Sequence, residues 1–163
     1  MKNTIAATLI VISSPTSAMP LWQDVNAAMT VDQVHDLYPQ QRAGVRWRSG
    51  STQVKGVLRV GSCEPTVIIH HPRGIVEQVS TGMVALGLHK TCTDEAYKAM
   101  LAKYGSPVGQ VEIEKASPAG FDYKNVVSTW IVSDVIVIMD RDTGYHDDRW
   151  SVIYAPVKAT TGL

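Results

Sequence analysis

Two stretches of the sequence, VHDLYPQQRAGVRW (34–47) and MLAKYGSPVGQVEI (100–113), follow the same plan 66 residues apart. Each runs from apolar residues at helical spacing, through a tyrosine and a helix breaker, into a segment that alternates apolar and polar residues. A hydrophobic period of 3.6 is typical of a helix, and a period of two is typical of a half-buried strand. The two stretches therefore predict a helix followed by strands, occurring twice in the chain.

Local signals place both helices. The first is predicted to begin at Thr30, because Gln33 follows at the spacing of a capping box, and to end at Pro39, which cannot continue a helix. The second is predicted to begin near residues 93–95, where Asp94 and Glu95 suit the positive end of a helix dipole, and to stop at Gly105. When the first helix is shifted by 66 residues, Val31, Val34 and Tyr38 coincide with Tyr97, Met100 and Tyr104.

Alternating segments separated by turn residues predict the strands. In the first half they are 45–48, 54–60, 65–71 and 74–80, with a further apolar stretch at 83–88. In the second half they are 108–114, 123–131, 135–141 and 149–154.

These elements predict an α+β fold in which a duplicated unit, one helix followed by about four antiparallel strands, packs its helices on an antiparallel sheet. The first unit would span 19–90 and the second 91–156, with a flexible tail at 157–163. The alternative, that an α+β domain without a duplication produces the same coincidence, stays open.

The first eighteen residues have the pattern of a secretory signal peptide. Lys2 supplies a positive charge, residues 5–12 form an apolar core, and residues 16–18 (TSA) are the small residues that a signal peptidase requires. The apolar run is far shorter than the ~20 residues that span a bilayer, so a membrane anchor is not expected. We expect cleavage after Ala18 and a periplasmic or secreted protein.

The chain has two cysteines, Cys63 and Cys92. An even number of cysteines in an exported chain favours a disulfide, because the compartment is oxidising. The bond would close a loop of about 30 residues and stabilise the fold by about 3–4 kcal/mol in the chain-entropy description. A reactive thiol is the alternative, but no C-x-x-C motif and no cationic neighbour accompanies either cysteine. The sequence therefore predicts the disulfide.

Charge is unevenly distributed along a chain with 15 basic and 15 acidic residues. The overall balance argues against a dedicated nucleic-acid-binding protein, which carries a large basic excess. The segment 40–90 is nevertheless net basic, and it predicts a basic sheet face as the candidate binding site. That face comprises Arg46, Trp47, Arg48, Lys55 and Arg59. It could attract an acidic protein loop, a lipid headgroup or an anionic glycan, or it could be an ordinary solvated surface.

The sequence contains no linear motif for catalysis or for binding phosphate or metal. It has no G-x-S-x-G elbow, no phosphate-binding glycine loop and no H-E-x-x-H. The stretch DRDTGYHDD (140–148) does not fit a calcium loop, because Tyr145 stands where glycine is needed, and a hairpin turn with solvated acids explains it better. His70 and His71 are adjacent on an expected strand, so their side chains should point to opposite faces. We therefore expect no metal, no cofactor and no enzymatic activity, although a catalytic group assembled only by folding stays open.

A family resemblance rests on three short motifs. AAMTVDQVHDLYP (27–39) resembles the GMT-x-x-x-V opening of small envelope domains related to the SmpA/OmlA (BamE) lipoproteins. The duplicated plan resembles the β-lactamase-inhibitor-protein fold, and LAKYGSP (101–107) with a distant W-x-V-x-Y strand (150–154) resembles uncharacterised periplasmic proteins of that kind. Ala28 replaces the glycine of GMT, and the lipid-acceptor cysteine is missing. The resemblance implies a scaffold for protein contacts rather than catalysis.

Together these features favour an exported, non-catalytic protein-binding module of the cell envelope. Its partner would be an envelope or secreted protein, for which an acidic surface would suit the basic face; no nucleic acid and no membrane anchor are expected. Two alternatives remain. An inhibitor of a hydrolase would insert a loop into a foreign active site, and an unrecognised hydrolase would need a cleft that joins a histidine to a carboxylate or a serine.

Overall fold

The computed structural model of the protein describes residues 20–39, 50–85, 90–116, 120, 122–143 and 148–157. Within these ranges the chain forms two helices, α1 (Val31–Leu37) and α2 (Lys90–Tyr104). Its strands, in chain order, are β1 (Pro20–Trp22), β2 (Val25–Asn26), β3 (Ser51–Val54), β4 (Thr66–His70), β5 (Gln78–Ala85), β6 (Gly109–Ala116), β7 (Asp122–Val132), β8 (Val135–Thr143) and β9 (Asp148–Pro156). The fold is α+β, as the sequence predicts.

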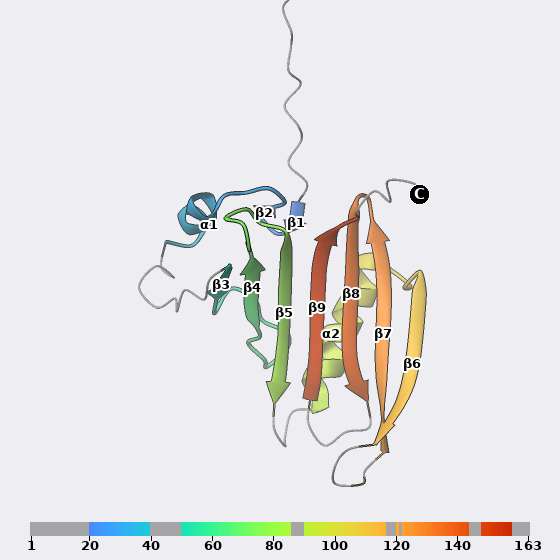
Figure 1. Cartoon of the computed structure of the whole chain (residues 1–163). Coiled ribbons are helices and arrows are strands. Elements are labelled where there is room, and N and C mark those ends of the chain that lie inside the picture. Colours follow the sequence, from blue (N-terminus) through green and yellow to red (C-terminus); the bar gives the residue numbers. More distant parts are fainter. Residues whose placement is uncertain are drawn as a thin grey trace, which may run out of the picture.

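Seven of the strands form one antiparallel sheet in the order β3-β4-β5-β9-β8-β7-β6, while β1 and β2 form a separate hairpin (Figure 1). Two meanders, β3 to β5 and β6 to β9, meet where β5 pairs with β9 and Val79 faces Tyr154. The described helices do not show an evident duplication, because α1 has 7 residues and α2 has 15. Strands β3 and β6 form the two edges of the sheet.

Helix α1 begins with the predicted capping box. The hydroxyl of Thr30 accepts a hydrogen bond from the backbone N–H of Gln33 at 3.3 Å, and the Gln33 side chain accepts one from the backbone N–H of Thr30 at 2.9 Å. These bonds satisfy backbone donors that the first turn of a helix leaves without partners. The helix ends at Leu37, two residues before Pro39.

Helix α2 begins at Lys90, somewhat earlier than the predicted start near residues 93–95. It ends where the sequence predicts. Gly105 has a φ of 74°, a left-handed conformation that glycine adopts at low cost, and its N–H donates to the carbonyl oxygen of Leu101 at 2.9 Å.

One face of the sheet packs against α2 and forms the core. Side chains alternate between the two faces along each strand, and many of those on the helix side of the central strands are buried. The buried set includes Ile69, Val79, Trp130, Val137, Met139 and Val152 from the sheet and Ala96 and Met100 from α2. The indole N–H of Trp130 donates to the carbonyl oxygen of Gly105 at 2.9 Å, which fixes the end of α2 against β7.

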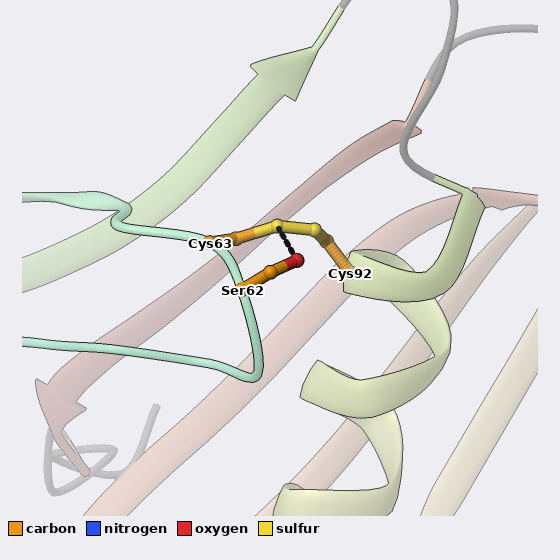
Figure 2. The surroundings of a disulfide bond; sticks show 3 residues. All are labelled: Ser62, Cys63 and Cys92. Atoms are coloured by element: carbon orange, nitrogen blue, oxygen red, sulfur yellow. Dashed lines mark hydrogen bonds between the residues drawn. A yellow bond between two sulfur atoms is a disulfide. The ribbon is translucent and has the colours of Figure 1, made fainter.

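The predicted disulfide between Cys63 and Cys92 is formed, with the two Cα atoms 6.1 Å apart (Figure 2). It joins the loop between β3 and β4 to the first turn of α2, and both cysteines are buried. A disulfide at this position is consistent with an oxidising compartment.

Two parts of the strand prediction for the first half are wrong. Strand β3 ends at Val54, and the predicted strand over 54–60 is an irregular loop in which Gly56 has a φ of 71°. The predicted strand at 74–80 starts later, as β5 at Gln78 after a turn at Gly74, and β5 continues into the apolar stretch at 83–88, of which residues 86–88 lie outside the described ranges. In the second half, β6 to β9 confirm the predicted strands to within a few residues.

Several predictions fall outside the described residues. They are the signal peptide at 1–18, the strand at 45–48 and the tail beyond residue 157. No helix in the described ranges is both long enough and apolar enough to cross a lipid bilayer.

Candidate functional site

The predicted basic face is not assembled in the described part of the chain. Residues 46–48 lie outside it, and Lys55 and Arg59 lie in the irregular loop between β3 and β4 instead of on neighbouring strand positions. Arg59 forms an ion pair with Glu64, with its Nη2 atom 2.8 Å from Oε1, and both side chains are exposed. The basic face therefore stays a prediction for residues 46–48.

The most exposed strand of the sheet is β6. Every residue of β6 is exposed, and β7 is its only partner strand among the described residues. Figure 1 shows β6 at one border of the sheet, with no other labelled element beyond it. The backbone N–H and C=O groups on the outer side of an edge strand have no sheet partner, so such a strand is a template for pairing with another chain.

The side of β6 that faces away from α2 carries two exposed apolar side chains, followed by Lys115 near the end of the strand. Val111 and Ile113 are on this side, and their side chains are 58% and 46% exposed. Val127, which pairs with Val111 on β7, is also on this side. Ile131, further along β7, is 56% exposed. Exposed apolar side chains that gather at one place on a surface mark an interaction site more often than scattered ones do.

The side of β6 that faces α2 is polar. The Oε1 atom of Gln110 accepts hydrogen bonds at 3.3 Å from the hydroxyls of both Tyr97 on α2 and Ser128 on β7. The Nε2 group of Gln110 donates to Glu112 at 3.2 Å, and the Nζ atom of Lys124 lies 3.7 Å from Glu112 Oε2. Gln110 and Glu112 are therefore held in place by contacts with α2 and β7.

Alternation places Glu114 on the same side as Glu112. The two carboxylates lie close to one cation, Lys124, which pairs with Glu114 in the register of β6 and β7. This side of the edge is therefore acidic, whereas the opposite side carries Val111 and Ile113 and has Lys115 as its charged residue.

A second arrangement joins His70 of β4 to Ser80 of β5, with His70 Nε2 2.8 Å from Ser80 Oγ. Burial lowers the pKa of His70 below its usual value of 6.5, and the neighbouring His71 lowers it further. The imidazole is therefore neutral at pH 7 and can accept the hydroxyl proton of Ser80. His71 points to the opposite face, as predicted, where its Nε2 lies 2.8 Å from the Oγ of Thr52.

Within the described residues, the backbone around Ser80 does not offer the His70–Ser80 pair the donors that an acyl-transfer site needs. Such a site needs hydrogen-bond donors directed at the developing oxyanion. Strand β5 is paired with β4 on one side and with β9 on the other, so the sheet occupies its backbone N–H groups around Ser80. His70 lines an open cavity of about 740 Å³, but Ser80 does not line it. The pair is a side-chain contact between the neighbouring strands β4 and β5.

Two aspartates on β8 form a third polar cluster. The Nδ2 group of Asn125 donates to Asp140 at 2.6 Å and to Asp142 at 2.9 Å, and Arg149 Nε lies 3.9 Å from Asp142. Asp142 is buried, so the expectation of solvated acids is wrong at this position. Within the described ranges, no group of three or more histidine, cysteine, aspartate or glutamate residues is placed to hold a metal ion.

Comparison with known proteins found no match: no family model, no curated protein and no solved structure is significantly similar to this chain. The geometry of the described residues therefore carries the functional argument. Sequence reasoning predicted β6 as a strand but missed it as a candidate site. The alternation of residue types in QVEIE (110–114) indicates that the two sides of β6 differ in chemistry. The position of β6 at an edge depends on the order of the strands.

Proposed function

We propose that this protein is an exported, non-catalytic protein-binding module and that it binds its partner through the edge strand β6. The observation that carries this proposal is the exposure of β6 along its 8 residues, with Val111 and Ile113 projecting from one side. Proteins commonly cover, shorten or interrupt such edges, because an exposed edge pairs readily with other chains. A long, exposed edge with apolar side chains fits a surface that a partner covers.

The proposed location is outside the cytoplasm, in the periplasm or the surrounding medium. The Cys63–Cys92 disulfide supports this location, since such bonds persist in oxidising compartments and are rare in the cytosol. The pattern of residues 1–18 supports export independently. The partner would then be another envelope or secreted protein.

We also propose that the chain consists of two related units, 19–90 and 91–156. Each unit has a helix before its strand meander, and the last strand of one meander pairs with the last strand of the other. The unequal helices would then reflect divergence of the two units.

The test is affinity capture from a cell-envelope extract, with the exported, disulfide-bonded protein as bait. A Val111→Lys/Ile113→Lys variant removes the apolar side of β6, and an Ile75→Lys/Val157→Lys variant makes the same change at exposed apolar positions elsewhere. We expect a partner that the native protein and the second variant retain and the first variant loses. An Arg46→Glu/Arg48→Glu bait tests the predicted basic face in parallel.

The outcomes separate the two surfaces. Retention of the same partners by the Val111→Lys/Ile113→Lys bait would exclude β6 as the binding surface. Loss of a partner only with the Arg46→Glu/Arg48→Glu bait would place binding on the basic face. If no bait retains a partner, the protein is not a binding module of the proposed kind.

The His70–Ser80 hydrogen bond is the observation that favours a second candidate function, a hydrolase. That function predicts turnover of activated esters that His70→Gln and Ser80→Ala both abolish. The binding function predicts no turnover and unchanged capture of the partner by both variants. A panel of ester substrates assayed beside the capture experiment separates the two functions.

A further inference from the structure

We infer that the partner adds a strand to β6, and that this strand carries basic side chains on the side of α2 and apolar side chains on the opposite side. The inference rests on the proposed function and specifies the chemistry of the partner. It follows from the unlike chemistry of the two sides of β6.

The acidic side of β6 selects for basic residues. When a strand is added to an edge, its side chains lie directly opposite those of the edge strand and on the same side of the sheet. Residues opposite Glu112 and Glu114 would therefore approach their carboxylates. Lys124 forms its ion pair with Glu112, so Glu114 has no ion-pair partner among the described residues. Opposite charges at these positions stabilise the pairing, and like charges oppose it.

The other side of β6 selects for apolar residues. Val111 lies beside Val127 of β7, and Ile113 follows two residues later on the same side. An added strand with apolar residues at alternate positions would cover both exposed side chains. A polar strand would leave them in water and would gain little from their burial.

A second copy of the same chain fits this edge poorly. Two β6 strands related by a twofold axis pair in antiparallel fashion, and the two registers with the longest overlap are centred on Glu112 and on Ile113. The first register places Glu112 opposite Glu112, and the second places it opposite Glu114. Both registers bring like charges together, so the acidic residues disfavour self-pairing while leaving the edge open to a basic strand.

The test uses capped synthetic peptides about as long as β6. One alternates lysine and valine, a second alternates glutamate and valine, and a third is the lysine peptide with alternate backbone nitrogens methylated to prevent strand pairing. Binding to the full-length, disulfide-bonded protein is measured by fluorescence anisotropy. We expect the lysine peptide to bind at least about tenfold more tightly than the glutamate peptide, a difference that a few opposed charges can supply.

Two protein variants complete the test. Glu112→Lys/Glu114→Lys should reverse the preference, so that the glutamate peptide binds more tightly. Asp24→Lys/Asp94→Lys makes the same change in net charge at exposed positions outside β6 and should keep the native preference. Circular dichroism and urea unfolding establish that both variants are folded.

Each outcome bears on one step. Equal binding of the lysine and glutamate peptides, or the same preference in both variants, would overturn the charge selectivity. Undiminished binding of the methylated peptide would overturn strand addition. If no peptide binds while the capture experiment yields a partner that depends on Val111 and Ile113, this inference fails and the proposed function stands. If both experiments fail, both are wrong.

Discussion

Gly82 of β5 lies so close to Trp150 of β9 that a Cβ atom on Gly82 would be 2.6 Å from the Trp150 carbonyl oxygen. The contact involves backbone, which cannot move aside as the end of a flexible side chain could. Gly82 also sits where the two meanders join, because β5 and β9 pair at the middle of the sheet. The close approach of the two strands therefore requires glycine at this position.

Replacing Gly82 with alanine should lower the free energy of unfolding by about 1–3 kcal/mol, the usual cost of overpacking. Urea denaturation measures the change. Gly109→Ala on β6 is the matched control, because a Cβ atom there would meet nothing within 4 Å. A Gly82→Ala protein as stable as the control would show that β5 and β9 are not this close.

Removing the disulfide by a Cys63→Ala/Cys92→Ala change should lower the free energy of unfolding by about 3–4 kcal/mol, because the unfolded chain regains the freedom of the closed loop. Urea unfolding of the native protein with a reducing agent should show a comparable loss. The reducing agent should have no effect on the double variant. An effect of equal size on both proteins would mean that the reductant acts elsewhere.

Replacing Thr30 with alanine should destabilise the protein by about 1 kcal/mol, since the backbone N–H of Gln33 loses its acceptor at the start of α1. Thermal unfolding followed by circular dichroism gives the change. Thr30→Ser keeps a hydroxyl at this position and should retain most of the stability. If both substitutions behave alike, the hydroxyl does not cap the helix.

The stability of the protein should fall as the pH falls below about 6.5, in part because of His70. Burial lowers the pKa of His70 in the folded state relative to 6.5, so the unfolded state takes up a proton first and is favoured in acid. The stability that neutral His70 contributes is fully present above the pKa of His70 in the unfolded state. It is lost as the pH falls through the lower pKa of His70 in the folded state. His70→Gln should therefore be less sensitive to pH than the native protein between pH 7.5 and about pH 5. Urea unfolding at several pH values measures this, and identical pH profiles would exclude the contribution.

Features that depend on neighbouring residues could be predicted from the sequence. The capping box at Thr30 and Gln33 and the end of α2 at Gly105 are local arrangements, and the structure has both. The Cys63–Cys92 pairing followed from the even number of cysteines. Strands β6 to β9 have long, regular alternation bounded by turn residues, so their positions were also predictable.

Features that depend on distant residues could not be predicted. The sequence predicts separate segments at 74–80 and 83–88, whereas the single strand β5 runs through Gly82 and pairs there with β9. Alternation over 54–60 predicted a strand, whereas the chain there leaves the sheet and leads to the disulfide at Cys63. The residues of β6 do not themselves indicate that this strand lies at the edge of the sheet, because that position follows from the pairing of β5 with β9.

The disulfide also has a consequence for how the protein responds to proteolysis. Strands β4 and β5 lie entirely within the covalent ring that Cys63 and Cys92 close. A protease that cleaves one peptide bond between these cysteines would therefore produce two pieces that remain one molecule. The nicked chain could keep both strands in the sheet, and fragments would separate on electrophoresis only after reduction.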